Sequence, residues 1–386
     1  MQKIGSSSYA PPEDFLRKLA EKMRLKEGEE AIRRVLREIH HRGKVGTKDI
    51  ARATRLPTPV TAAIRRELEK AGLVARKGGA ILTVTGKEFV EVVLGMVAKT
   101  KETNDSQEIA PEYEPILEKI REASSRRPNA NPKLDQTHAT PETALRRALY
   151  MLDGGNLAGR NVLFLGDDDL VSVAAGLLRV TKGITVVDID GRLLETIMGV
   201  SKEEGLSIQC VLHDLREPLP ESLRGAFDTF LTDPPYTIPG LELFISRGIQ
   251  ALRWRKTSIA YMAYPDKPPL EMLKAHGTLN WMGLYVDEII PRFNIYLGAE
   301  ILANTTSMFR LVVTGEARPV ITGPFQGGIY TGELKPTIRV YRCRCGKAIV
   351  VGSSTGFTTI EELKAGGCPK CRRREGFRLS EKQRAD

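Results

Sequence analysis

The chain has 386 residues, 41% of them hydrophobic and 27% charged, and a formal net charge of +10. This length exceeds one ordinary hydrophobic core and predicts a soluble globular protein of two or three domains. No apolar run approaches the roughly 20 residues of a membrane span, which excludes a membrane-spanning protein and favours a cytoplasmic one.

The charge is unevenly distributed along the chain. Residues 162–236 hold 13 acidic and 6 basic side chains, a net charge of −7. Residues 30–90 hold 14 basic and 6 acidic side chains, and residues 335–386 hold 13 and 5, so each of these stretches carries +8. Basic ends of this kind fit contacts with nucleic acid and equally fit solvated helix faces.

Residues 1–97 are predicted to form a winged-helix domain. Apolar residues recur at helical spacing over 32–39, and Thr47 is expected to cap a second, shorter helix. The turn at 57–59 leads into a third helix, which Gly72 is expected to end.

The wing is predicted to be a hairpin of strands 74–76 and 80–84. The third helix is expected to expose Arg65, Arg66 and Lys70. Exposed basic side chains there fit the reading of DNA, but winged helices inside enzymes also serve as dimerisation or substrate-covering modules.

Residues 98–133 are polar and interrupted by prolines, with one short helical pattern over 116–123. This composition predicts a linker.

Residues 134–334 alternate between strand and helix patterns. The expected strands are 161–166, 184–189, 208–212, 227–232, 257–262, 285–290 and 308–313, and the expected helices include 170–180 and 193–204. This order predicts an α/β fold, a doubly wound and mostly parallel sheet of the Rossmann-like methyltransferase type. Ligands of such a sheet lie at the carboxyl ends of its strands.

Acidic residues follow four successive strands of this sheet. The first strand ends in Gly166-Asp167-Asp168-Asp169, where nucleotide-binding folds ordinarily place a glycine-rich turn. The later strands are followed by Asp188 and Asp190, by Asp214 and by Asp233. These carboxylates are expected to share one crevice and to favour a cationic substrate, while an acid that ends the second strand fits a ribose diol. The alternative is that each aspartate only caps a turn or a helix.

The motif Asp233-Pro234-Pro235-Tyr236 follows the fourth strand. In amino-methyltransferases this arrangement holds a nitrogen nucleophile, because the aspartate and a prolyl carbonyl accept its hydrogens and the tyrosine ring packs beside it. Two prolines fix the backbone so that the acceptors are already aligned. The alternative is a rigid turn without chemistry.

Residues 335–386 contain Cys343-Arg344-Cys345 and Cys368-Pro369-Lys370-Cys371, separated by 22 residues. Four thiolates in two such pairs suit tetrahedral zinc and predict a small zinc-ribbon-like module with a structural ion, with disulfides or free thiols as the alternative. The run Arg372-Arg373-Arg374 fits RNA or DNA binding and also simple solvation. Cys210 lies on a predicted strand and is expected in the core.

The chain resembles the branched-chain polyamine synthase family, the N(4)-bis(aminopropyl)spermidine synthases of thermophilic archaea and bacteria. The resemblance rests on residues 166–169, 187–190, 233–237 and 135–143, and it extends over 30–314. It implies transfer of aminopropyl groups from decarboxylated S-adenosylmethionine to the secondary amine of spermidine, and a homodimer. The cysteine module is not expected in this family.

The resemblance implies roles for individual residues. Asp188 would hold the ribose, Asp214 the adenine amino group, and Asp167 and Asp168 the aminopropyl ammonium. We expect Asp169 to be the base or the residue that orients the acceptor, and Asp233 and the Pro234 carbonyl to align the nitrogen beside Tyr236. Gln136, His138 and Glu142 are expected to cover the site, and His138 is assigned no catalytic role.

Two other functions fit parts of the sequence. An S-adenosylmethionine-dependent amino-methyltransferase acting on DNA or RNA agrees with the Asp-Pro-Pro-Tyr motif and the basic ends. The carboxylate of its donor would, however, be repelled by three neighbouring aspartates. A transcriptional regulator that senses a polyamine agrees with the winged helix but leaves a complete candidate site unused.

Overall fold

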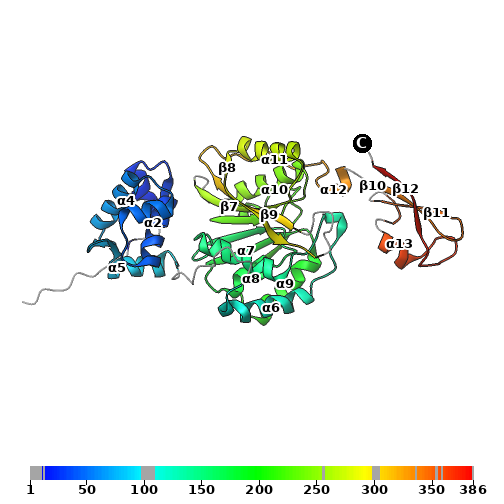
Figure 1. Cartoon of the computed structure of the whole chain (residues 1–386), viewed down its shortest axis with the longest axis horizontal. Coiled ribbons are helices and arrows are strands. Elements are labelled where there is room, and N and C mark those ends of the chain that lie inside the picture. The colour runs from blue at the N-terminus through cyan, green and yellow to red at the C-terminus, as the bar shows by residue number, and fades with distance from the viewer. Residues whose placement is uncertain are drawn as a thin grey trace, which may run out of the picture.

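The structure is a computed structural model that describes residues 11, 14–96, 109–253, 257–297, 305–334, 337–352, 355–357 and 360–384. Figure 1 shows a helical N-terminal part, a central sheet with helices on both faces, and a small C-terminal part rich in strands. Among the described residues, no helix combines the length and the apolar character that a bilayer crossing requires.

The N-terminal part consists of helices and one hairpin. Its elements are α1 (Phe15–Met23), α2 (Gly28–Arg42), α3 (Thr47–Thr54), α4 (Thr58–Lys70), β1 (Val74–Arg76), β2 (Ala80–Leu82), α5 (Val84–Glu88) and a π-helical turn (Phe89–Val93). The apolar faces of α1, α2 and α4 meet the hairpin in one buried cluster. The three predicted helices and the hairpin are present, and α1 and α5 were not predicted.

Two details of this part differ from the prediction. Gly46 is the N-cap of α3, and the Thr47 hydroxyl instead accepts a hydrogen bond from Arg65 (2.7 Å). The second hairpin strand ends at Leu82, because the Thr83 side chain caps α5 by accepting a backbone hydrogen bond (2.9 Å).

The predicted linker is only partly a linker. Residues 98–108 lie outside the described residues, but the chain then forms α6 (Glu114–Ser125). Leu117 and Ile120 of α6 are buried in the same apolar cluster as the sheet. The helical pattern predicted over 116–123 is confirmed as part of α6, and this helix covers the central sheet.

The central sheet has seven strands in the order β5-β4-β3-β6-β7-β9-β8. Their bounds are β3 (Asn161–Leu165), β4 (Gly183–Asp188), β5 (Ile208–Leu212), β6 (Thr229–Thr232), β7 (Ser258–Tyr264), β8 (Leu284–Ile295) and β9 (Thr305–Val313). Strands β5, β4, β3, β6 and β7 pair in parallel. Strand β9 pairs antiparallel with β7, and β8 pairs antiparallel with β9. The mostly parallel sheet is therefore confirmed.

Helices cover both faces of this sheet. Helices α6, α7 (Pro141–Asp153), α8 (Val171–Leu177) and α9 (Gly191–Glu203) lie on one face, and α10 (Ile238–Ala251) and α11 (Pro269–Trp281) lie on the other (Figure 1). The side chains of β3 alternate between the two apolar clusters, as a strand buried on both faces requires. Three short 3-10 helices, Pro111–Tyr113, Pro132–Leu134 and Glu221–Leu223, lie in the connections.

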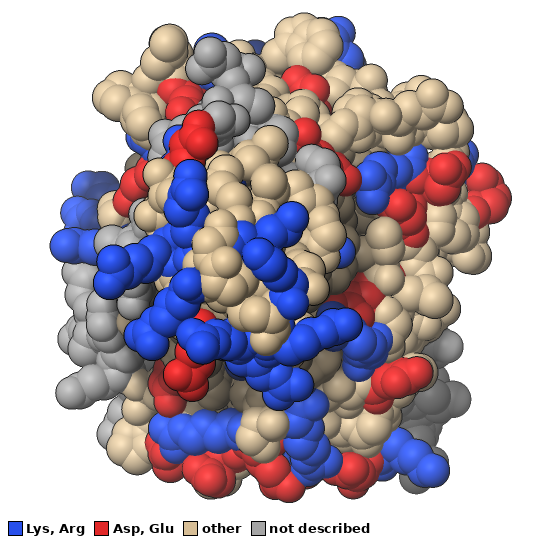
Figure 2. Space-filling model, turned by 90° about the vertical axis from the view of Figure 1, so that its right-hand side faces the viewer, with Lys and Arg blue, Asp and Glu red and all other residues tan. Residues whose placement is uncertain are grey.

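The C-terminal part is a three-stranded antiparallel sheet with one helix. Its elements are β10 (Thr337–Arg342), β11 (Ala348–Val351), α13 (Ile360–Gly366) and β12 (Arg378–Arg384), preceded by the short helix α12 (Thr331–Leu334). Its small core joins Cys343 and Cys368 to Ile349, Val351 and Leu363. Figure 2 views the molecule from the end that carries this part.

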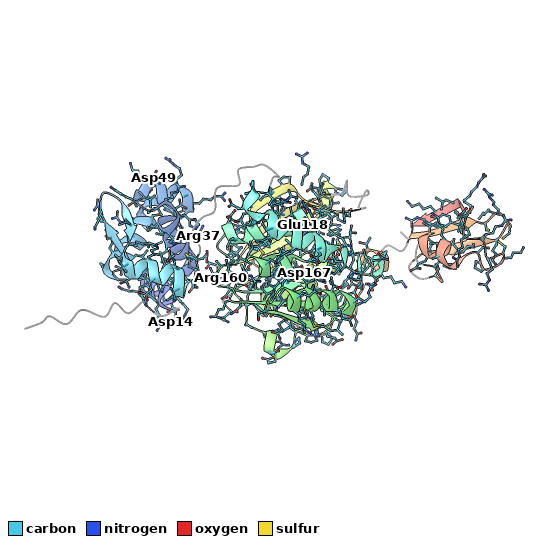
Figure 3. The ribbon with its side chains drawn as sticks, turned by 90° about the horizontal axis from the view of Figure 1, so that it is seen from below. Asp14, Arg37, Asp49, Glu118, Arg160 and Asp167 are labelled. Carbon is cyan, nitrogen blue, oxygen red and sulfur yellow. The ribbon has the colours of Figure 1, made fainter. Side chains whose placement is uncertain are left out.

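Buried polar contacts join the N-terminal helices to the central part. Arg160 binds Glu30 (3.1 Å), and Arg37 donates to the carbonyl oxygen of Gly154 (2.7 Å). Figure 3 labels both arginines where the two parts meet. Because a buried charge is costly without its partner, these contacts fix how the two parts are joined.

Candidate active site

The carboxyl ends of β3, β4, β5 and β6 open into one cleft, which is where a parallel sheet of this kind binds its ligand. One aspartate from each strand end lines it: Asp168, Asp188, Asp214 and Asp233. Asp135 adds a fifth from the segment before α7. The prediction that acids after four strands share one crevice is confirmed.

Asp167 has a structural position. Its carboxylate accepts hydrogen bonds from the backbone of Val171 (2.8 Å) and Ser172 (3.1 Å), so it caps the start of α8. Burial raises the pKa of Asp167 to about 7. Figure 3 labels it within the sheet part, and it does not line the cleft. The predicted contact with the substrate ammonium is therefore wrong for Asp167, because its oxygens face the helix.

Asp169 also lies behind the cleft. One carboxylate oxygen accepts a hydrogen bond from the backbone of Ala139 (2.5 Å), and the other binds Arg147 (2.7 Å). Its side chain is only 3% exposed and does not line the cleft. The geometry contradicts direct contact of Asp169 with a substrate, because both of its oxygens are already held by the protein.

Arg147 connects this buried pair to the cleft. Its guanidinium is 1% exposed and donates to Asn294 (2.8 Å), Tyr296 (2.7 Å) and Asp233 (3.0 Å) as well as to Asp169. Burial opposes the charge, yet Tyr296, Asp169 and Asp233 together hold the pKa of Arg147 well above its usual value. The sequence prediction missed Arg147, although a charged residue on the apolar stripe of a helix is a signal of such a network.

Asp233 lines the cleft and has one carboxylate oxygen without a partner among the described residues. Its Oδ2 accepts hydrogen bonds from Arg147 and from the Tyr296 hydroxyl (2.5 Å). Its Oδ1 is buried and has no hydrogen-bond partner among the described residues. Burial raises the pKa of Asp233. Pro234 and Tyr236 line the cleft beside it, as predicted.

Asp168 has an unpaired carboxylate in the cleft. Arg127 binds its backbone carbonyl (3.0 Å), but no hydrogen bond or ion pair reaches its carboxylate within the described part of the chain. Burial, followed by the nearby charges of Asp169 and Asp233, raises the pKa of Asp168 well above its usual value. Folding therefore places a carboxylate here at an electrostatic cost that a bound cation would offset.

The other end of the cleft holds two acids in fixed orientations. Asp188 accepts a hydrogen bond from the backbone of Asp190 (2.8 Å). Asp214 is held by Arg216 (3.2 Å), and this guanidinium lies over the ring of Tyr330, 5.6 Å from its centroid. Tyr330 also lines the cleft and was not predicted.

The three residues expected to cover the site have different positions. Gln136 lines the cleft and donates to Asp190 (3.3 Å). Glu142 binds Arg121 (3.0 Å) outside the cleft, so its predicted contact with substrate is wrong. His138 does not line the cleft, and burial lowers its pKa.

The four C-terminal cysteines meet in one cluster. Their sulfur atoms lie within 4.8 Å of one another, with Cys343 3.6 Å from Cys371 and Cys345 3.7 Å from Cys368. These distances exceed a disulfide bond and match the edge of about 3.8 Å that follows for a tetrahedron with Zn–S bonds of about 2.3 Å. The residues therefore fit a zinc ion. Cys210, predicted in the core, is half-buried on β5.

A mostly parallel sheet with an acidic cleft at its strand ends places the central part in the class of Rossmann-like, methyltransferase-type transferases. A model of the branched-chain polyamine synthase A C-terminal domain matches residues 115–343, more than half of the chain. The chain therefore belongs to the branched-chain polyamine synthase family.

Individual relatives agree with this family. The chain is 36% identical over 248 residues to the N(4)-bis(aminopropyl)spermidine synthase of Methanocaldococcus jannaschii, which covers 62% of this chain and 71% of that protein. It is 43% identical over 356 residues to an uncharacterized protein of the same organism, covering 90% and 89%. The crystal structure of the branched-chain polyamine synthase from Thermus thermophilus, in complex with N4-aminopropylspermidine and 5'-methylthioadenosine, matches with a TM-score of 0.52 and 25% identity, covering 83% of this chain and 98% of that one.

Proposed function

We propose that the protein is an aminopropyltransferase that moves aminopropyl groups from decarboxylated S-adenosylmethionine to the secondary amine of spermidine. The product of two transfers is N(4)-bis(aminopropyl)spermidine. The named relative of M. jannaschii and the ligands of the T. thermophilus structure support this choice of substrates.

The observation that carries the proposal is the pair of unpaired acceptors in the cleft. Asp168 and Asp233 line the cleft, and neither the Asp168 carboxylate nor the Asp233 Oδ1 atom is paired with a cation among the described residues. A donor with a sulfonium and an ammonium group, and an acceptor with several ammonium groups, would supply the missing positive charge. A donor that keeps its carboxylate would instead be repelled.

The transfer breaks one bond and forms one bond. The nitrogen lone pair attacks the aminopropyl carbon next to sulfur, the C–S electron pair goes to sulfur, and 5'-methylthioadenosine leaves. The attacking nitrogen must first lose a proton, which an acceptor in the cleft can take. We assign this proton to Asp168 instead of Asp169, since only Asp168 faces the cleft.

Asp233 would align the attacking nitrogen. Its Oδ1 and the Pro234 carbonyl are acceptors on a backbone that two prolines stiffen. Arg147 and Tyr296 hold Oδ2, so Oδ1 is the oxygen that remains without a protein partner among the described residues. Asp188 would accept the ribose hydroxyls and Asp214 the adenine amino group, while Gln136 and Tyr330 border the same space.

Product analysis by mass spectrometry tests this function. The purified protein is incubated with spermidine and either decarboxylated or ordinary S-adenosylmethionine. We expect spermidine to grow by one and then two aminopropyl units with the decarboxylated donor only. Methyl transfer to DNA or RNA with the ordinary donor would contradict the proposal in favour of an amino-methyltransferase.

We also propose that Cys343, Cys345, Cys368 and Cys371 bind one structural zinc ion. Bound zinc would hold β10, α13 and the start of β12 around a core too small to be stable alone. The double variant Cys368→Ser, Cys371→Ser should lose one zinc per chain by elemental analysis and unfold its C-terminal part. An unchanged zinc content would contradict the site.

Four further assignments stay predictions. The three helices and hairpin of the N-terminal part support a winged-helix domain, with boundaries at 1–97, 98–133, 134–334 and 335–386. A homodimer, a cytoplasmic location and nucleic-acid binding by the basic ends are the others. Sedimentation of the purified protein would test the dimer.

A further inference from the structure

Local ion pairs are found in the N-terminal basic end of the chain. In the N-terminal part, basic side chains pair with carboxylates of the same part: Arg17 with Glu21, Lys22 and Lys70 with Glu67, Arg65 with Glu69, and Lys87 with Glu91. Even Arg65, expected to be exposed for DNA, is half-buried. Other basic side chains of this part, Lys44, Lys48, Arg52 and Arg66 among them, are exposed and form no ion pair with a described carboxylate, so the pairs cover only part of its positive charge.

The C-terminal part concentrates exposed basic side chains in a short segment. Ten of them are exposed: Arg342, Arg344, Lys347, Lys364, Lys370, Arg372, Arg373, Arg374, Arg378 and Lys382. None of the ten forms an ion pair with a carboxylate among the residues that the structure describes. Only three exposed glutamates are described in the same part. Figure 2 shows lysine and arginine side chains gathered across this end of the molecule.

The sheet of this part places like charges opposite each other. Arg342 on β10 is the register partner of Arg378 on β12, and Arg339 is the partner of Lys382. Like charges directly opposite on antiparallel strands destabilise the sheet. An arrangement that is unfavourable in the free protein becomes favourable when an anion lies across the strands.

The cysteine cluster holds the arginine run in a fixed turn. The backbone of Cys368 donates to the carbonyl oxygen of Arg373 (2.8 Å), and Arg372 donates to Cys368 (2.8 Å). Gly367 packs so closely here that a Cβ atom would lie 2.7 Å from the Arg372 carbonyl oxygen. Because the backbone is already ordered, binding through Arg372, Arg373 and Arg374 would cost less conformational entropy than binding through a flexible tail.

We propose that the C-terminal part, residues 337–384, binds the phosphate backbone of a nucleic acid across β10, β12 and the Arg372–Arg374 turn. Six of the ten exposed basic residues are arginines, whose planar guanidinium groups match phosphate geometry. Among the described residues of this part, the exposed large apolar side chains are Val350 and Leu379. Binding to a lipid surface requires a larger apolar face, so this composition favours a polynucleotide. The proposal is independent of the transferase activity.

Fluorescence anisotropy with the full chain tests the proposal. The probes are a labelled 20-nucleotide single-stranded RNA and a labelled 20-base-pair DNA, each titrated at several salt concentrations. We expect binding that weakens with salt in a linear log–log relation. The triple variant Arg372→Gln, Arg373→Gln, Arg374→Gln should bind at least ~10-fold more weakly, with a salt slope smaller by about 2–3.

A second variant separates binding from folding. Arg342→Gln, Arg378→Gln removes a like-charge pair, so it should weaken nucleic-acid binding while the thermal stability of the protein stays equal or rises. The matched control Lys22→Gln, Lys87→Gln removes the same charge from exposed but paired lysines and should leave binding within about twofold. Zinc content and aminopropyl transfer should be unchanged in all three variants.

Three outcomes would overturn the proposal. The first is equal binding by wild type and both C-terminal variants. The second is an equal loss in the control, because that result would reflect net charge alone. The third is binding to vesicles of phosphatidylcholine and phosphatidylserine without binding to either probe, which would assign the surface to a membrane.

Discussion

Asp168 and Asp169 are neighbours in the sequence, but their carboxylates have opposite environments. Asp169 is held by Arg147 and the backbone of Ala139, whereas Asp168 faces the cleft with a raised pKa and no partner among the described residues. A carboxylate whose ionisation is unfavourable in the folded protein lowers its stability. A bound cationic ligand offsets this cost. The chemistry therefore belongs to Asp168 in our proposal, and Asp169 positions Arg147.

Asparagine substitutions should separate these two roles. Asp168→Asn should lower kcat by about 10²–10⁴-fold and leave thermal stability equal or higher, because it removes an unpaired buried charge. Asp169→Asn weakens a buried ion pair and should cost about 3–5 kcal/mol of stability. Steady-state kinetics and thermal unfolding of both variants check this; loss of stability in Asp168→Asn with near-normal turnover would contradict it.

The raised pKa values of Asp168 and Asp233 also predict a pH dependence. An acid with a raised pKa is neutral below it, so the cleft loses negative charge as the pH falls. The Kd for spermidine, measured by calorimetry with 5'-methylthioadenosine present, should therefore decrease as the pH rises from 6 to 8. Asp168→Asn should flatten this dependence, and a Kd that increases with pH would be the opposite of our expectation.

At the scale of elements, tight backbone packing joins the N-terminal helices to the sheet. A Cβ atom on Gly159 would lie 2.4 Å from the carbonyl oxygen of Leu94, at a φ of +65°. Gly205 has a similar φ of +60° and open space around it. Alanine substitutions at Gly159 and Gly205 therefore separate the cost of the clash from the cost of the left-handed backbone.

Gly159→Ala should therefore destabilise the protein more than Gly205→Ala. The left-handed conformation alone costs about 1–2 kcal/mol in both, and the clash should add at least as much in Gly159→Ala. Urea unfolding followed by circular dichroism compares the two variants. Equal urea midpoints of the two variants would mean that the contact between the N-terminal helices and the sheet accommodates the added Cβ atom without a loss of stability.

The sequence predicted the elements whose signals are local. Alternation of apolar strands and helices predicted the parallel sheet, and acids after four strands predicted a shared cleft. It predicted a helical pattern over 116–123 but not the packing of α6 on the sheet, and it missed Arg147 and Tyr330, whose partners lie far away in the chain. The order of the three aspartates after β3 also could not show which one faces the cleft, because that depends on how the turn packs against α7.

At the scale of the whole molecule, charge is arranged for two kinds of ligand. The central cleft is acidic and suits polycations, and the C-terminal part is basic and suits a polyanion. The two basic stretches carry equal net charges, and ten exposed basic side chains are gathered within residues 342–382. If both proposals hold, the protein would make a branched polycation while bound to a nucleic acid, a polyanion to which polycations bind.

The central claim is that the unpaired carboxylates of the cleft select a donor without a carboxylate. The most direct test is the ratio of Kd values for ordinary and decarboxylated S-adenosylmethionine, measured by calorimetry for the wild type and for Asp168→Asn. We expect the wild type to prefer the decarboxylated donor by about 100-fold or more, since two carboxylate–carboxylate repulsions of about 1.4 kcal/mol each, which only the ordinary donor experiences, give this factor, and Asp168→Asn to lose about tenfold of that preference. Equal affinity for both donors, or a preference that Asp168→Asn leaves unchanged, would contradict the account.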